Sequence, residues 1–113
     1  MVIFGNIKNI KIIQIMVKQI KIQNKETLSN MANNKDIILA KAMIEELLKN
    51  LNTRKKSIPL LNIKLVNEDE IFTFIVEKQY FREALVENLD VFLKAEEYEW
   101  CRKIQDAINE LKK

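Results

Sequence analysis

The 113-residue sequence contains no histidine and a single cysteine, Cys101. Without histidine, the chain cannot form the Ser–His or Cys–His pairs of nucleophilic catalysis, nor a metal site built from histidine and cysteine. One cysteine also excludes an internal disulfide, which is typical of proteins in the reducing cytoplasm. We therefore expect a cytoplasmic protein that is not an enzyme and that has no metal site and no cofactor.

Glycine and proline are equally scarce, with one residue of each, whereas 48% of the chain is hydrophobic. This composition excludes a low-complexity or globally disordered chain. No stretch approaches the roughly 18 apolar residues of a membrane-spanning helix, and the start of the chain is a poor secretory signal peptide. The length suits one small domain with a modest core, and we expect no contact with a membrane.

Positive charge is concentrated near the N-terminus. Residues 1–30 hold five lysines and one glutamate, whereas residues 31–113 hold 14 basic and 15 acidic residues. The isoleucines of this basic extension fit both a helical period and the alternation of a strand. Because β-branched side chains favour strands, we expect a strand or hairpin. Met31 would also suit a natural start, which would leave residues 1–30 outside the native core.

The remaining residues, 31–113, are expected to form a single α+β domain. Four asparagines mark residues 24–35 as a polar connector, and the period of apolar residues predicts a helix over residues 36–51. Asn33 or Asn34 is expected to cap this helix, because an asparagine side chain accepts hydrogen bonds from the first turn.

A turn over residues 52–59 and a β-hairpin over residues 60–78 are predicted next, because two strand patterns flank an acidic link. Apolar and polar side chains alternate in the first of these strands. The link, Glu68-Asp69-Glu70, offers few ligands for a divalent cation. We expect it to be a solvated hairpin tip. The second strand is apolar on both faces, which indicates that each face is covered.

From Tyr80 onward the period becomes helical and predicts an antiparallel pair of helices over residues 80–112, with a break near residues 94–97. The first helix is expected to bury one stripe of apolar residues: Phe81, Leu85, Leu89, Phe92 and Leu93. In the second helix, Cys101 is expected to be a small core residue, because a helix interior supplies no activator for a thiol.

Several residues among the last 30 match the sequence pattern of a known helical motif. The matching residues are Leu89, Leu93, Glu97, Tyr98, Glu99, Cys101, Ile104, Asp106, Ile108 and Leu111. Together they resemble the UVR motif, a helical hairpin of bacterial excision-repair subunits and of small regulators of ATP-dependent proteases. This chain departs from the motif at Arg102, Gln105 and Ala107, where the family has a small residue, an arginine and an acidic residue.

The resemblance implies a non-enzymatic module or adaptor that contacts a protein partner or a second copy of itself, without repair chemistry. The candidate partner-binding residues are Glu97, Tyr98, Trp100, Gln105 and Asp106. Tyr98 is expected to close the hairpin as an aromatic plug. Trp100 lies on a flank of the apolar stripe, where its ring would either contact a partner or cover the edge of the protein's own sheet.

Two other functions follow from the charged residues. Arg54, Lys55 and Lys56, together with the lysine-rich N-terminus, would bind nucleic acid if they converged on one surface with aromatic rings among them. We do not favour this alternative, because the aromatic residues lie in residues 72–100 among acidic ones. A small carboxylate enzyme is the least supported, because nothing places two carboxylates across a pocket.

Overall fold

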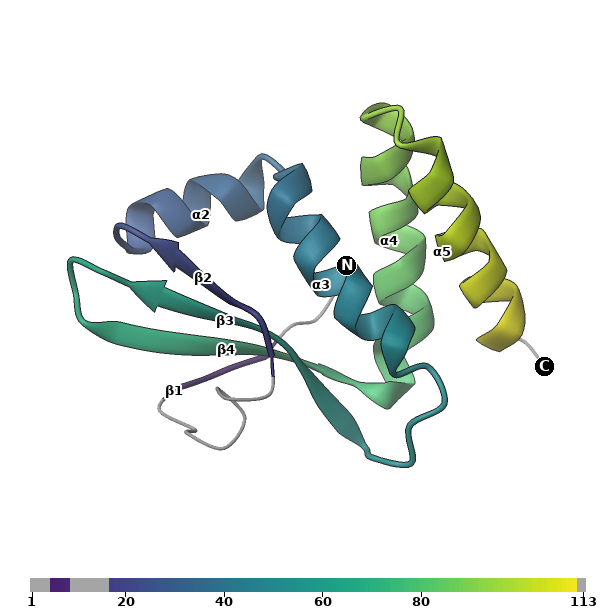
Figure 1. Ribbon diagram of the computed structural model, residues 1–113, viewed down its shortest axis with the longest axis horizontal. Coiled ribbons are helices and arrows are strands. Elements are labelled where there is room, and N and C mark those ends of the chain that lie inside the picture. The colour runs from purple at the N-terminus through teal and green to yellow at the C-terminus, as the bar shows by residue number, and fades with distance from the viewer. Residues whose placement is uncertain (1–4, 9–16, 112–113) are drawn as a thin grey trace.

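The computed structural model describes residues 5–8 and 17–111 and confirms an α+β fold with a C-terminal pair of helices (Figure 1). The strands are β1 (Gly5–Lys8), β2 (Gln19–Ile22), β3 (Ser57–Leu65) and β4 (Glu70–Glu77). The helices are α2 (Lys25–Asn33), α3 (Ile37–Lys49), α4 (Phe81–Lys94) and α5 (Tyr98–Leu111), with a short 3-10 turn, η1 (Lys78–Tyr80), before α4.

The four strands form one mixed sheet in the order β1-β4-β3-β2. The predicted hairpin supplies the two central strands, which pair antiparallel. The basic extension supplies both edges, since β1 pairs antiparallel with β4 and β2 pairs parallel with β3. The expected strand is therefore confirmed at residues 5–8 and 19–22, but a local hairpin is wrong because these strands lie on opposite edges. Residues 1–4 and 9–16 lie outside the described part.

The segment predicted as a polar connector contains a helix, α2. The side chain of Asn24 caps its first turn by accepting a hydrogen bond from the Thr27 N–H at 2.9 Å. Leu28 and Met31 are spaced three residues apart and pack against the core. No residue of α2 is fully buried, so its apolar stripe is narrow and easily overlooked in the sequence.

Helix α3 confirms the prediction over residues 36–51 but uses a different cap. The carboxylate of Asp36 accepts hydrogen bonds from the N–H groups of Ile38 and Leu39 at 2.9 and 3.2 Å. The expected caps, Asn33 and Asn34, instead end α2. Asp36 takes the capping position because Lys35 adopts a left-handed φ of 53° and reverses the chain between the helices.

Strand β3 begins at Ser57, inside the predicted turn. A bulge between Pro59 and Leu61 interrupts its register with β4. Proline lacks an N–H and is tolerated in a sheet where no second neighbour needs that donor. Because β2 reaches only Asn62 to Leu65 of β3, Pro59 has β4 as its sole neighbouring strand among the described residues.

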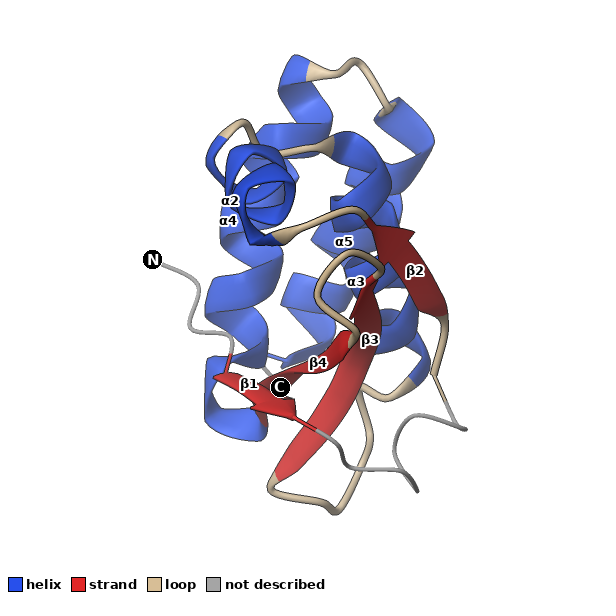
Figure 2. Cartoon of the chain, turned by 90° about the vertical axis from the view of Figure 1, so that its left-hand side faces the viewer, coloured by secondary structure: helices blue, strands red, loops and turns tan. Residues whose placement is uncertain are grey.

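Helices α2 to α5 gather on one side of the sheet (Figures 1 and 2). The sheet face beneath them buries Ile58, Leu61, Ile63, Leu65, Phe72 and Val76. Helix α3 packs on β3, α4 packs on α3, and α5 packs on α4. The C-terminal pair therefore reaches the sheet largely through α3.

The opposite face of the sheet carries a buried polar pair that the sequence pattern did not reveal. Asn62 and Thr73 are cross-strand neighbours and have no exposed surface. The Thr73 hydroxyl donates a hydrogen bond to Asn62 Oδ1 at 2.6 Å. The burial of this pair agrees with the expectation that each face of the second strand is covered.

Candidate protein-interaction site

The two helices of the C-terminal pair are joined by residues 95–97 in a Schellman turn. The N–H of Glu97 donates to the carbonyl of Phe92 at 2.9 Å, and the N–H of Glu96 donates to the carbonyl of Leu93 at 3.1 Å. This turn needs a left-handed residue after the helix, and Glu96 adopts it with a φ of 59°. The predicted interruption of the helix near residues 94–97 is therefore confirmed.

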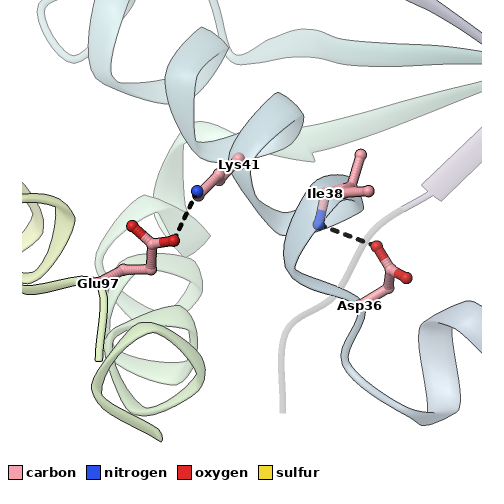
Figure 3. Close-up of polar contacts among 4 residues, drawn as sticks. All are labelled: Asp36, Ile38, Lys41 and Glu97. Atoms are coloured by element: carbon pink, nitrogen blue, oxygen red, sulfur yellow. Dashed lines mark hydrogen bonds and ion pairs between the residues drawn. The ribbon is translucent and has the colours of Figure 1, made fainter. Parts of the chain in front are cut away.

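Glu97 ties the hairpin to α3. Its carboxylate Oε1 accepts a charged hydrogen bond from Lys41 Nζ at 2.8 Å, as Figure 3 shows. The backbone carbonyl of Glu97 also accepts from the Cys101 N–H and so begins α5. Both charged side chains are about one third exposed. Glu97, one of the five candidate partner-binding residues, therefore pairs with a residue of its own chain, Lys41, which lies 56 positions earlier.

Trp100 also has an internal partner, but on α4. Its ring stacks on the fully buried ring of Phe92, with centroids 5.3 Å apart and planes inclined by 3°. The ammonium groups of Lys41 and Lys103 lie 5.9 and 5.5 Å from the ring centroid, within the range of cation–π attraction. Trp100 remains half-buried, so its ring covers α4 at the edge of the core.

Tyr98 does not close the hairpin. Its side chain is 64% exposed, so the expected aromatic plug is wrong. Tyr98 and Trp100 are two residues apart on a helix of 3.6 residues per turn, and they project to nearly opposite sides. The link is closed instead by the backbone hydrogen bonds at Glu96 and Glu97.

The remaining two candidates are exposed polar residues of α5. Gln105 donates to the side chain of Asn109 at 3.3 Å. Asp106 lines a groove of about 690 Å³ between α5 and the end of α3, with Lys103 and Glu110 beside it. The structure thus divides the five candidates. Glu97 pairs with α3 and Trp100 stacks on α4, whereas Asp106 lines the groove beside the end of α3. Tyr98 and Gln105 lie seven residues apart and share an exposed flank of α5.

An apolar strip lies on the outer side of α4, although two of its residues, Leu89 and Leu93, were expected in the core. Val86 is 44% exposed, Leu93 is 48% exposed, and Leu89 between them is half-buried. The placement of Leu93 in the buried stripe is therefore wrong, since Phe92 takes the core position. Val86, Leu89 and Leu93 lie at steps of three and four residues on one face of α4 and form the α4 strip. Tyr98, the first residue of α5, is exposed as well.

The other expectations for this region concern burial and ligands. Cys101 is buried in the core, as predicted. Within residues 5–8 and 17–111, no group of three or more acidic or cysteine side chains is arranged to hold a metal ion. In the same ranges, every helix is too short or too polar to cross a membrane.

The loop residues proposed for nucleic-acid binding lie at the opposite end of β3 from Lys18 and Lys21, the lysines just before and within β2. Arg54, Lys55 and Lys56 are exposed in the loop before β3. Lys18 bonds through its carbonyl to Asn62, and a strand rises about 3.3 Å per residue. Its backbone is therefore about 20 Å from that of Lys56. The cation that lies beside this loop is Lys78, directly after β4, which donates hydrogen bonds to the carbonyls of Lys56 and Thr53.

Comparisons of this chain with protein-family models, with curated proteins and with solved structures give no match. Functional inference therefore rests on the residues and the geometry of the chain itself. The most specific surface feature is the α4 strip on the C-terminal pair of helices.

Proposed function

We propose that this chain is a non-enzymatic interaction protein of the cytoplasm whose C-terminal helical pair, which resembles a UVR motif, packs against a second copy of the chain. The observation that carries the proposal is the α4 strip. Its two outer side chains, Val86 and Leu93, are each more than two fifths exposed. Exposed apolar residues that form a continuous patch mark contact surfaces, whereas isolated ones need no explanation.

The spacing of the strip supports a helical partner. Arg82, Val86, Leu89 and Leu93 follow one another at steps of four, three and four residues. Such steps form the seam along which two α-helices pack side by side. Within α4, the seam from Arg82 to Leu93 is about 17 Å long at 1.5 Å per residue, which suits a contact with one helix of similar length. Glu96 lies just beyond the end of this helix.

The charges at its ends favour a second copy as that partner. One end carries the exposed Arg82 and the other carries the exposed Glu96. In an antiparallel pair of α4 helices, Arg82 of each copy meets Glu96 of the other. Val86 then meets Leu93, and Leu89 lies on the symmetry axis. A two-fold interface requires this kind of self-complementary surface.

Sedimentation of the full chain over a range of concentrations tests the proposal. We expect a monomer–dimer equilibrium that Leu93→Glu shifts toward the monomer, because a charge replaces an apolar contact. Ile38→Glu is the matched control, since Ile38 is an equally large aliphatic residue, is 64% exposed and lies on α3 outside the strip. The control should dimerise like the parent chain.

A charge exchange tests the antiparallel arrangement. Arg82→Glu and Glu96→Arg should each weaken the dimer, and the double variant should restore it, because the pair then has the opposite polarity. Failure of the double variant to restore the dimer would reject this arrangement. A single-chain mass at all concentrations, with no crosslinked product, would count against the second copy as partner.

A further inference from the structure

The fold brings a fourth cation to the basic loop before β3. The N–H of Lys78 donates to the carbonyl of Lys56 at 2.7 Å, and Lys78 Nζ donates to the carbonyl of Thr53, also at 2.7 Å. The start of β3 and the end of β4 are therefore joined at this point. We name the resulting group the basic cluster: Arg54, Lys55, Lys56 and Lys78.

The basic cluster surrounds a concave space of about 610 Å³, whose remaining lining residues are Ser57, Glu77 and Gln79. Glu77 is the only acid in that lining, and its carboxylate accepts a hydrogen bond from the Gln79 amide at 2.7 Å. Four cations thus face one carboxylate. None of Arg54, Lys55 and Lys56 forms an ion pair with any residue in the described ranges.

The basic cluster differs in this respect from four other lysines, which have carboxylate partners. Lys25, Lys41, Lys49 and Lys94 each lie within 4.0 Å of a carboxylate. In the basic cluster the like charges repel one another, and an anion in the cavity would replace that repulsion with attraction. Arginine binds phosphate oxygens through a planar fork and lysine binds them as a point charge.

The lining also discriminates between anions. It contains no aromatic ring, and proteins that hold single-stranded nucleic acid use aromatic rings as stacking platforms. The cavity is within the size range of small-molecule sites, and several separate cations suit a ligand that carries several charged groups. We propose that the basic cluster binds a small polyphosphate anion. This site is independent of the α4 strip.

Calorimetric titration of the full chain with tripolyphosphate at an ionic strength of about 0.1 M, where the Debye length is about 10 Å, tests the proposal, with orthophosphate as the comparison. We expect tripolyphosphate to bind at least about tenfold more tightly, because it engages several cations at once. The double variant Lys55→Gln/Lys56→Gln should lose at least about tenfold in affinity. These side chains are exposed, so the variant should fold.

The matched control is Lys21→Gln/Lys94→Gln, which removes two positive charges at exposed positions outside the cavity. Its affinity should stay within about twofold of the parent chain, because distant surface charges are screened. Equal losses in the two double variants would overturn the site in favour of diffuse attraction. Binding of an oligonucleotide without binding of tripolyphosphate would also overturn it and would assign the cluster to nucleic acid.

Discussion

The first 30 residues and the last 33 residues of this chain reach the same folded structure by different routes. The C-terminal helices begin and end where their apolar period and their link predict. The N-terminal isoleucines fit two periods, and the strands that they form lie on opposite edges of the sheet. Helices are specified by neighbours in sequence, whereas an edge strand is specified by the strand that it meets.

The two regions also differ in the entropy that must be lost to close the chain between their contacts. Helix α5 buries its own stripe against α4 within one short hairpin, so the contact needs little loop closure. Strand β2 buries Ile22 only after pairing with β3, about 40 residues later in the chain. Four substitutions or deletions, taken from the largest expected effect to the smallest, test this contrast.

Removal of residues 1–30 should have the largest effect. It exposes both edges of the β3–β4 hairpin, and unpaired edges promote aggregation. The loss of the buried Ile22 and the half-buried Ile20 removes about 3 kcal/mol or more of apolar burial. We expect no stable monomer, as measured by urea unfolding and sedimentation. An unchanged unfolding midpoint would show instead that residues 1–30 lie outside the native core.

Phe92→Ala tests the C-terminal pair. Phe92 is fully buried and stacks under Trp100, so its truncation should cost about 3–5 kcal/mol. Trp100 fluorescence should shift to longer wavelength, because the ring loses its cover. Ile38→Ala is the control, because Ile38 is 64% exposed and lies outside the α4 strip, and it should change stability by less than about 0.5 kcal/mol. Equal losses at the two positions would contradict the assignment of Phe92 to the core.

Asp36→Ala tests the junction between α2 and α3. The Asp36 carboxylate accepts two backbone hydrogen bonds, and loss of such a cap costs about 1 kcal/mol. Thermal unfolding measures the effect. Asn33→Ala is the comparison, because the sequence favoured Asn33 as a cap while the structure places it at the end of α2. A larger loss for Asn33→Ala would restore the original assignment.

In urea unfolding below the concentration at which the chain would dimerise, Glu96→Gly should have the smallest effect, and it should be stabilising. Glu96 holds a left-handed φ of 59°, a conformation that glycine adopts without a steric penalty. Glycine also raises the entropy of the unfolded chain, which offsets part of this gain and leaves a net stabilisation of about 0.5 kcal/mol. Lys35→Gly in the N-terminal half, with a φ of 53°, should behave alike. A loss of stability at either position would show that the side chain makes a compensating contact.

Much of the fold could be predicted because its signals are local. The helix over residues 36–51, the β-hairpin and the C-terminal pair follow from periods of apolar residues, and Cys101 follows from its place in such a period. Helix α2 was missed because its stripe consists of Leu28 and Met31, which pack only at the margin of the core. The Asn24 cap and the acidic Glu26 in its first turn were the available signal.

Less of the candidate site could be predicted, because its contacts join distant residues. Glu97, Tyr98 and Trp100 adjoin in sequence, yet Glu97 pairs with Lys41 and Tyr98 points into solvent. The periodicity predicted that Phe92 and Leu93 are both buried. In the structure, packing buries Phe92 and leaves Leu93 exposed. Lys78 joins Lys56 through the pairing of β3 with β4.

The sequence by itself determined the α+β class, the central hairpin and the helical pair, since the free energy of each depends on neighbours a few residues apart. Tertiary structure alone decided which strand each edge segment meets, which of two adjacent apolar residues is buried, and which charges have partners. These choices depend on surfaces that exist only once the sheet and the helices have packed together.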